Sequence, residues 1–332
     1  MGRRTRARRG TTATALLAAA LTASLAAGCT GTGGSPDDGR GSPQRSPRTS
    51  PQESSPKPPR TVPPVLAVKL DNAPDARPHA GVDAADVVYV EQVEGGLSRL
   101  MAVYATGLPD AVGPVRSARE SDLELLRQFH RPVLAFSGAQ SKLLPVIDRA
   151  PLEARTPAEA PGAYFRGGDR PAPHNLYLRP GRLLPSAPGP EALTTGFHYG
   201  PAPAGGTPES SRTVRYPAAR FTFTWSGSEG RWLVAMDGTP AVTPEGGRVT
   251  AATVVVQYVT VRASAYRDFL GSNSPYTETV GSGTAQVLRD GRAHDVRWKR
   301  ATAAGGTAFT TGDGTPVNFA GGPVWVVLVK AP

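Results

Sequence analysis

Four short segments of the chain concentrate polar and charged residues that are hard to explain as ordinary surface. They combine groups that bind ligands or transfer protons, namely carboxylates, guanidinium groups, an imidazole and amides. Glycine and proline surround them, which is typical of strand ends and helix starts, where rigid elements present side chains to a ligand. The candidate ligand-binding residues are Lys69, Asp71, Asn72, Arg77, Glu91, Glu94, Arg99, Arg116, Ser117, Arg119, Arg166, His174, Asn175 and Tyr177.

Arg116 and Arg119 indicate either an anion site or an internal ion-pair network. Both lie at the start of a predicted helix, whose dipole already presents positive charge there. Each arginine is therefore unfavourable by up to about 1 kcal/mol unless a negative group is close. A bound anion that accepts from backbone N–H groups and a guanidinium would supply that charge. Glu91 or Glu94, reaching across from a neighbouring strand, would supply it as well, and the sequence leaves both interpretations open.

His174 is the other residue suited to chemistry, in a proline-flanked loop with Arg166 and Tyr177 nearby. It can act as a general base, a ligand or a hydrogen-bonded strut. A hydrolytic triad of Ser117, His174 and Glu91 is disfavoured, because Ser117 has the position of a helix cap. It also lacks the Gly-x-Ser-x-Gly surroundings of a serine hydrolase.

No residue spacing points to a metal or a cofactor. The histidines are scattered along the chain at His79, His130, His174, His198 and His294. Asp71, Glu91 and His174 are the three residues that a fold could gather around a metal, although their spacing does not show it. Phosphate-binding and dinucleotide-binding glycine motifs are missing from the sequence. We therefore predict neither a resident metal nor a cofactor.

The strands and helices predicted around the candidate residues indicate an α+β fold. Its first part is a layered α/β domain over residues 63–210. The segment Ser117-Ala118-Arg119-Glu120 has the spacing of a capping box, and apolar residues follow at helical intervals. Predicted strands cover residues 65–70, 86–93, 99–106 and 132–136, and predicted helices cover 118–129 and 142–148. The stretch 150–210 is rich in loops.

A mostly antiparallel β domain is predicted over residues 211–332. The dipeptides Asp237-Gly238, Asp290-Gly291 and Asp313-Gly314 are hairpin-turn signals within it. Predicted strands cover residues 213–216, 220–225, 231–236, 253–261, 284–288, 296–300 and 324–329. Four tryptophans in this region occupy strand positions and predict core packing.

Cys29 is the single cysteine, and it ends the run Leu25-Ala26-Ala27-Gly28-Cys29. Five arginines precede an uncharged apolar stretch over residues 13–27, which is the pattern of a secretory signal peptide. Small residues before a lone cysteine indicate a lipoprotein signal over residues 1–28, cleaved before Cys29, whose thiol then carries a diacyl anchor with palmitate-like chains. Two acyl chains hold a protein stably on a membrane.

The segment 29–62 is rich in Pro, Ser and Gly and predicts a disordered tether, since it cannot bury enough apolar surface to fold. The formal charge of +10 is concentrated in the signal peptide and this tether. Residues 65–332 keep a net charge of about +3, which is too little for a nucleic-acid footprint. A nucleic-acid partner is therefore not expected.

The segments VKLDNAPDARP, ADVVYVEQVEGGLSRLMAVY, GPVRSAR and APHNLY resemble those of the YerB-like family of bacterial lipoproteins, a family of unknown function. VVVQY, GSGTAQVLRDGRAHDVRWKR and VNFAGGPVWVVLV are similar to the C-terminal domain of that family. The resemblance runs from about residue 62 to the end of the chain. It implies an envelope lipoprotein with an α+β N-terminal domain and a β-rich C-terminal domain, and it implies no reaction.

The sequence thus predicts a lipid-anchored protein on the extracytoplasmic face of the cell membrane, with membrane contact through Cys29. Its expected role is binding or assembly in the cell envelope, with an anionic-ligand groove in the N-terminal domain. A cell-wall fragment or an envelope protein is the expected partner. The alternative is a wall-acting hydrolase or transferase that uses Glu91 or His174 as base and Arg116 and Arg119 as an anion clamp.

Overall fold

Strands dominate the computed structural model, which describes residues 62–268 and 271–332. Residues 59–332 belong to one compact unit. The predicted signal peptide, Cys29 and the predicted tether up to residue 61 lie outside the described residues. The described chain begins at the strand that carries the first candidate cluster.

An 11-stranded sheet forms the centre of the structure, and its first half comes from the N-terminal part of the chain. These strands are β1 (Leu66–Asp71), β2 (Val87–Gln92), β3 (Ser98–Tyr104), β4 (Val133–Ala135) and β5 (Glu153–Arg155). β3 lies between β2 and β1 and is antiparallel to both, whereas β1, β4 and β5 are parallel neighbours. β3 therefore brings the ends of β1 and β2 to the same region of the sheet.

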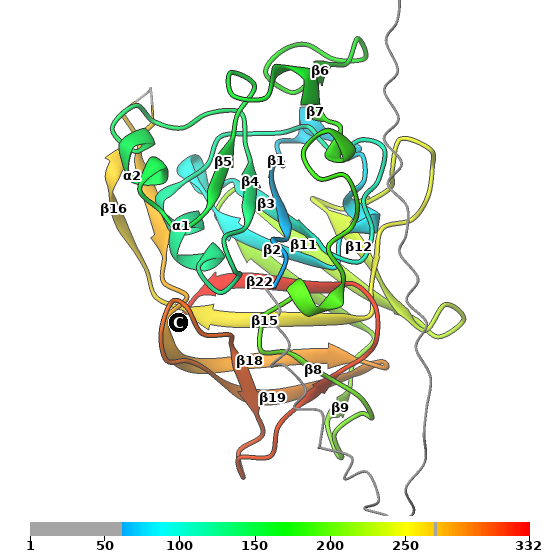
Figure 1. Ribbon diagram of the computed structural model, residues 1–332. Coiled ribbons are helices and arrows are strands. Elements are labelled where there is room, and N and C mark those ends of the chain that lie inside the picture. The colour runs from blue at the N-terminus through cyan, green and yellow to red at the C-terminus, as the bar shows by residue number, and fades with distance from the viewer. Residues whose placement is uncertain (1–61, 269–270) are drawn as a thin grey trace, which may run out of the picture. The chain divides into compact units, whose positions relative to one another are not determined.

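The second half of this sheet comes from the C-terminal part of the chain. Its strands are β9 (Thr207–Pro208), β15 (Thr253–Val259), β18 (Gly281–Arg289), β19 (Arg292–Arg300), β20 (Ala308–Thr310) and β22 (Val324–Lys330). The last strand, β22, is parallel to β15 on one side and to β2 on the other. Figure 1 shows β22 between these two neighbours. One hydrogen-bonded sheet thus joins both predicted domains.

A five-stranded sheet and three small ladders complete the β structure. The five-stranded sheet contains β10 (Ser211–Tyr216), β11 (Ala219–Ser226), β12 (Arg231–Met236), β13 (Thr239–Pro240) and β14 (Thr250–Ala251). The ladders pair β6 (Tyr164–Arg166) with β7 (Leu176–Leu178), β8 (His198–Tyr199) with β21 (Asn318–Phe319), and β16 (Val261–Arg267) with β17 (Asn273–Thr277). The β16–β17 hairpin contacts α1 (Glu120–Leu126), the first of two short helices.

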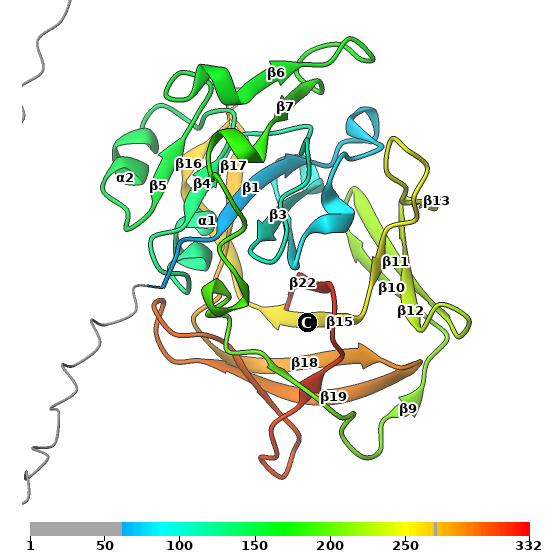
Figure 2. The same ribbon diagram turned by 45° about the vertical axis from the view of Figure 1, so that its right-hand side comes forward.

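Two α-helices occur in the described residues, α1 (Glu120–Leu126) and α2 (Leu144–Asp148). Apolar side chains of both helices pack with Val65, Ala67 and other residues on one face of the central sheet. The opposite face carries Leu66, Val68 and Leu70, which pack with side chains of the five-stranded sheet. Figure 2 shows β10, β11 and β12 to one side of β1 and β3. Strand alternation thus divides the core into two layers.

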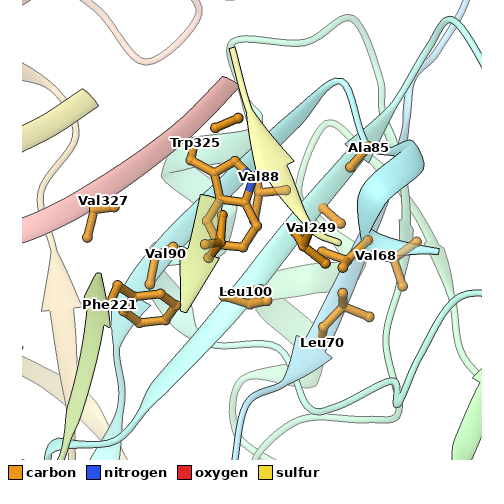
Figure 3. Close-up of a cluster of buried hydrophobic side chains, with 14 of the residues drawn as sticks. Val68, Leu70, Ala85, Val88, Val90, Leu100, Phe221, Val249, Trp325 and Val327 are labelled. Atoms are coloured by element: carbon orange, nitrogen blue, oxygen red, sulfur yellow. The ribbon is translucent and has the colours of Figure 1, made fainter. Parts of the chain in front are cut away.

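Trp325 of β22 lies at the centre of the core between the two sheets. Its ring lies near the rings of Phe221 and Phe223 from β11, with centroid distances of 6.3 and 6.0 Å. Figure 3 shows it beside Val88, with Val90, Leu100 and Phe221 in the same cluster. The C-terminal strand therefore contributes a large side chain to the core that covers the N-terminal strands.

The structure supports the predicted fold class only in part. The β-rich C-terminal region is mostly antiparallel, although β22 and the short β21 each have parallel partners, and the short helices lie on one face of the N-terminal strands. The prediction of a layered α/β domain overestimated the helix content of the N-terminal region. The predicted boundary at residue 210 stays a prediction, since strands from both sides of it share a sheet.

The predicted helix over residues 118–129 is shorter in the structure, and its cap is different. Arg119 is the N-cap, with extended backbone (φ −126°, ψ 164°), and the helix begins at Glu120. The Asp122 carboxylate accepts a hydrogen bond of 2.7 Å from the Arg119 backbone N–H. Asp122 therefore performs the function predicted for the capping box, and the prediction of Ser117 as N-cap was wrong.

Candidate functional site

The candidate site lies where β1, β2 and β3 present alternate side chains toward α1. Asp71 of β1 and Glu91 of β2 both lie opposite Arg99 of β3 in the strand register. Side chains directly opposite on neighbouring strands share a face of the sheet. Lys69, two residues before Asp71, lies on that face as well and reaches α1. Sheet pairing thus gathers residues that are far apart in the sequence.

Lys69 and Glu91 form the deepest part of this face, together with two residues of α1. The Lys69 ammonium donates to the Glu91 carboxylate and, at 2.7 Å, to Asp122 Oδ1. Ser121 Oγ donates to Glu91 Oε2 at 2.8 Å. The side chains of Lys69 and Asp122 are fully buried. A buried charge needs such partners, so these contacts explain why polar residues occur inside the sheet.

The two carboxylates of this cluster have opposite pKa shifts. Burial favours the protonated form of Glu91, but the Lys69 ammonium and the hydrogen bonds outweigh it and hold the pKa of that carboxyl below its usual value. Burial and the neighbouring Glu91 carboxylate raise the pKa of Asp122 to about 7. Glu91 is ionised but 3% exposed. The burial of Glu91 therefore argues against its predicted use as a base that contacts substrate.

Arg119 forms an internal ion pair with Glu94. Its Nε and Nη2 donate to the two Glu94 oxygens at 2.7 and 2.8 Å, and its Nη1 donates to the Ala118 carbonyl at 3.0 Å. Ser274 of β17 also donates to Glu94. Burial opposes ionisation of Glu94, but the Arg119 interactions outweigh it and lower its pKa to about 2. The Arg119 guanidinium is thus committed to Glu94, which argues against its predicted use as an anion clamp.

Asp71, His174 and Arg116 form a separate cluster at the end of β1. Asp71 Oδ2 lies 2.8 Å from His174 Nδ1 and 3.3 Å from Arg116 Nε. Burial opposes ionisation of Asp71, but the Arg116 charge and the hydrogen bonds outweigh it and lower the pKa of this carboxyl. An ionised carboxylate only accepts, so His174 Nδ1 carries the hydrogen. The Nε2 atom of a neutral His174 is then left with a lone pair.

Arg116 differs from Arg99 and Arg119 because its side chain is more exposed and keeps N–H donors without a partner among the described residues. The side chain is 26% exposed, and its Nε is buried without a hydrogen bond among the described residues. Its guanidinium makes the ion pair with Asp71 alone within residues 62–268 and 271–332. Arginine offers five N–H donors. This guanidinium can therefore donate hydrogen bonds to an anionic ligand.

Arg99 of β3 adds a further positive charge, which is buried next to this cluster. It is 8% exposed and donates to the Ser117 carbonyl at 2.9 Å. Burial, together with the charges of Arg119 and Arg116, lowers its pKa to about 10. Arg99, Arg116 and Arg119 face two nearby carboxylates, Asp71 and Glu94. Among these five groups, the positive charges outnumber the negative ones by one.

The other candidate residues build the surrounding loops. Asn72 Nδ2 donates to Ser98 Oγ at 2.9 Å, and Arg77 Nε donates to Asn72 Oδ1 at 3.0 Å. Arg166 Nη1 donates to Asn175 Oδ1 at 2.7 Å across the ends of β6 and β7. The loop that these strands enclose carries His174. Asn72, Arg77 and Asn175 are thus bonded within these loops, whereas the Arg166 side chain is exposed.

The contacts of Tyr177 and Ser117 do not indicate that either side chain binds a ligand. The Tyr177 ring stacks on Phe165 with centroids 5.5 Å apart. Ser117 Oγ lies 3.5 Å from Ser137 Oγ, and no described imidazole hydrogen-bonds to it. The Ser117–His174–Glu91 triad is therefore not assembled. Asp71 and His174 do meet, but Glu91 does not join them, and no described group of three such residues could hold a metal ion.

A polar cavity of about 400 Å³ borders the Glu94–Arg119 ion pair. Of the predicted residues, Glu94, Ser117 and Arg119 line it. Five further residues contact the candidate residues or line this cavity, and the sequence did not predict them. They are Ser121, Asp122, Ser137, Tyr266 and Ser274. Asp122 alone carried a signal, since an acidic residue in the first turn of a helix is common. The remaining residues are brought in by tertiary structure.

Comparison with known proteins supports the fold and the family. Residues 51–192 match the N-terminal domain, and residues 212–326 the C-terminal domain, of the family described as "Protein of unknown function (DUF3048)". "Putative lipoprotein YerB" of Bacillus subtilis (strain 168) is 42% identical over 64 residues, which span 19% of this chain and 19% of that protein.

The crystal structure of the YerB protein from Bacillus subtilis has the same fold, with a TM-score of 0.65 and 19% sequence identity. The superposition covers 80% of this chain and 90% of that one. None of the helices in residues 62–268 and 271–332 is long and apolar enough to cross a membrane. With both family domains matched in chain order, the protein belongs to the two-domain DUF3048 family, the YerB-like family that its motifs resemble.

Proposed function

We propose that this protein is a lipid-anchored, extracytoplasmic binding protein that holds an anionic ligand at Arg116. The observation that carries the proposal is the Arg116 guanidinium, which has one ion-pair partner, Asp71, and a buried Nε without a hydrogen bond among the described residues. A carboxylate or phosphate can accept two hydrogen bonds from such a group. This use of Arg116 agrees with the excess of positive charge around it.

Three neighbours give this ligand site its electrostatic character. Asp71 orients Arg116 and His174 through the same oxygen, Oδ2. Arg99 adds positive charge from below, and its burial means that water screens this charge less than at the surface. His174, 19% exposed, supplies a further polar group at the rim. A ligand with a negative group and an adjacent hydrogen-bonding group fits these surroundings.

The anchor is the second part of the proposal. A related protein is named a lipoprotein, and the sequence of this chain predicts a lipoprotein signal over residues 1–28, directly before Cys29. Diacylation of Cys29 would hold the folded body at the extracytoplasmic face of the cell membrane. Ligands available there include cell-wall fragments that carry carboxylates or phosphates, and acidic segments of envelope proteins.

Calorimetric titration of the full chain in detergent tests the ligand site. The probes are muramyl dipeptide, which carries one carboxylate, and glycerol 3-phosphate. Arg116→Gln should weaken binding of the preferred probe at least tenfold, because a charged pair of hydrogen bonds is lost. Its melting temperature should stay within about 3 °C of that of the unmodified protein. Arg297→Gln, a change at an exposed arginine of β19, is the matched control and should leave the affinity unchanged.

Two results would contradict the proposal. Equal affinity of the Arg116→Gln variant and the unmodified protein would show that the guanidinium does not contact the anion. A large loss of stability in this variant would instead assign Arg116 to a structural ion pair.

The Asp71–His174 hydrogen bond favours one second candidate, a wall-acting hydrolase or transferase. A carboxylate that orients Nδ1–H leaves Nε2 as a base, while Arg116 binds the anionic part of the substrate. Glu91 and Arg119 have no part in this version, because both are committed to internal partners. Turnover of muropeptides that is lost in His174→Gln would support it. Turnover that is equal in both proteins would exclude His174 as the base.

A further inference from the structure

A second cavity, separate from the anion site, lies between the loop after β1 and the β12–β13 turn. Its volume is about 450 Å³, within the range of about 300–1,000 Å³ that is usual for small-molecule sites. The apolar lining residues come from both segments and are Pro74, Pro78, Met236, Pro240, Ala241 and Val242. These walls indicate a ligand with a mainly apolar surface.

The charged residues of this cavity neutralise each other. Arg77 Nη1 lies 2.8 Å from Asp237 Oδ2, so an ion pair connects the two walls. Arg77 also donates to the Asn72 carbonyl at 2.8 Å. No excess charge is left at the wall to attract an ion. A neutral ligand therefore fits this cavity better than an anion or a cation.

His79 supplies the polar group that a ligand could recognise. It lines the cavity, is 3% exposed, and its Nε2 lies 2.6 Å from the Asp71 carbonyl oxygen. A carbonyl oxygen only accepts, so Nε2 carries the hydrogen and Nδ1 of the neutral ring is an acceptor. Among the described residues, no group donates to Nδ1. An unpaired acceptor in such a buried residue favours a ligand that donates a hydrogen bond.

The protonation state of His79 supports this assignment. Burial and the nearby charge of Arg77 lower its pKa to about 4, although the bond to the Asp71 carbonyl opposes the shift. The ring is therefore neutral at physiological pH. Nδ1 then stays an acceptor rather than becoming a donor.

We propose that this cavity binds a neutral, mainly apolar small molecule with one hydroxyl group, which donates to His79 Nδ1. The site is independent of the anion site at Arg116, although both are built on Asp71. The Asp71 backbone carbonyl holds His79, and the Asp71 carboxylate holds His174. The expected ligand class is a hydrophobic alcohol or phenol.

Methyl NMR of the full chain in detergent, labelled with ¹³C at the methionine methyl groups, gives a readout at the site itself. Met236 lines the cavity. Met101 is buried in the core layer between the central sheet and the two α-helices, and it serves as an internal reference. The probes are 1-naphthol and 1-methoxynaphthalene, which differ in the hydroxyl donor. We expect 1-naphthol to shift the Met236 signal at about fivefold to tenfold lower concentration, and the Met101 signal to stay in place.

Two variants make the test decisive. His79→Phe should remove most of the preference for 1-naphthol. Comparing the ratio of the two probes in this variant with the same ratio in the unmodified protein cancels their different partition into micelles. Thr239→Trp changes an exposed residue of β13 that lines the cavity, so it should block the Met236 shift without disturbing the core. If His79→Phe fails to fold, Thr239→Trp and the ratio between the probes still decide the outcome.

The proposal would be overturned if neither probe shifted Met236, or if both shifted it equally in the unmodified protein. A Met236 shift that survives in Thr239→Trp would overturn it as well, since the probe would then bind elsewhere. Arg116→Gln should keep the full Met236 response. Failure of the anion site is therefore distinguishable from failure of this one.

Discussion

At the scale of single residues, burial and partners decide what each charged group can do. Lys69 and Glu91 are ionisable but enclosed, and each is bonded to other buried groups. Breaking such a buried pair on one side leaves an uncompensated charge, which costs about 3–5 kcal/mol. Arg116 has the same kind of charge but is partly exposed and has donors to spare. The first group stabilises the fold, and the second is available to a ligand.

The raised pKa of Asp122 predicts a pH dependence of stability. Because its pKa is about 7 in the folded protein and near 3.8 when unfolded, the folded state holds a proton that the unfolded state releases. The free energy of unfolding should therefore fall as pH rises from 5 to 8. Asp122→Asn should flatten this dependence, as measured by urea denaturation at each pH. Asp148→Asn, at an exposed position of α2, should keep the original slope.

The lowered pKa of Glu94 predicts the opposite effect in acid. Its carboxylate is ionised above a pKa of about 2 in the folded protein, whereas the unfolded value is near 4.5. This contribution to stability is complete above pH 5 and is lost as pH falls toward 2. Glu94→Gln should reduce the loss of stability between pH 5 and pH 3, as followed by circular dichroism. An unchanged acid transition in this variant would mean that the Arg119 pair does not persist in solution.

At the scale of elements, α1 depends on contacts from the C-terminal part of the chain. A helix of seven residues is not stable by itself. Arg300 of β19 is fully buried and donates through Nη2 to the Glu124 and Leu125 carbonyls, at 2.9 and 3.3 Å. A cation is favourable at this end of a helix. The Glu124 carboxylate accepts from the Thr279 N–H at 2.7 Å, which fixes the helix from a second side.

Arg300→Met should therefore weaken the attachment of α1. The variant leaves buried carbonyls unpaired, so we expect a loss of about 3 kcal/mol in the free energy of unfolding. Hydrogen exchange at the amides of residues 120–126 should accelerate more than exchange in β15. Arg297→Met, at an exposed position of the same strand, is the control. Uniform acceleration across the protein would indicate a global effect without a specific role for α1.

At the scale of the whole molecule, the two family domains share one sheet and one core. β22 pairs with β2 over four residue pairs, from Val87–Val324 to Val90–Val327. The Tyr216 hydroxyl donates to carbonyls on both strands, those of Val90 and Leu328, at 3.3 and 2.9 Å. Removing either part exposes a strand edge and apolar surface of the other. The family boundaries therefore describe the sequence better than they describe independent folding units.

Thermal unfolding of the full chain should accordingly show one cooperative transition for the folded body. A chain that ends at residue 210 should lack native near-ultraviolet circular dichroism and should aggregate, because β2 loses its partner β22 and the core loses Trp325. Trp325→Ala in the full chain should lower the free energy of unfolding by about 3–5 kcal/mol. A well-folded fragment ending at residue 210 would contradict this account.

The proposed lipid anchor predicts where the whole molecule is found in the cell. Cys29→Ser removes the thiol that the predicted acyl chains need, so the protein should leave the membrane fraction after export. Cell fractionation followed by immunoblotting measures this. Thr30→Ser is the neighbouring control and should stay with the membrane. Membrane association that is unchanged in Cys29→Ser would refute the lipid anchor.

Local patterns were sufficient for much of the secondary structure. Apolar runs and Asp-Gly turns predicted strands such as β12 and β22 closely, because strand propensity and turn chemistry act over a few residues. Both central residues of the Asp237-Gly238 and Asp290-Gly291 turns have positive φ, as this kind of hairpin requires. The hairpin of β16 and β17 escaped prediction, because its strands are polar and partly exposed and lack an apolar alternation.

The sequence by itself determined the residue types of the site, the order of the elements and the family, since these depend on local composition and motifs. Tertiary structure alone decided the partners: Glu91 with Lys69, Arg119 with Glu94, and Asp71 with His174. The physical reason is that pairing across a sheet and docking of a short helix join residues 22 to 103 positions apart. A charged side chain is enclosed where such distant segments cover it, and it stays accessible to a ligand where they do not.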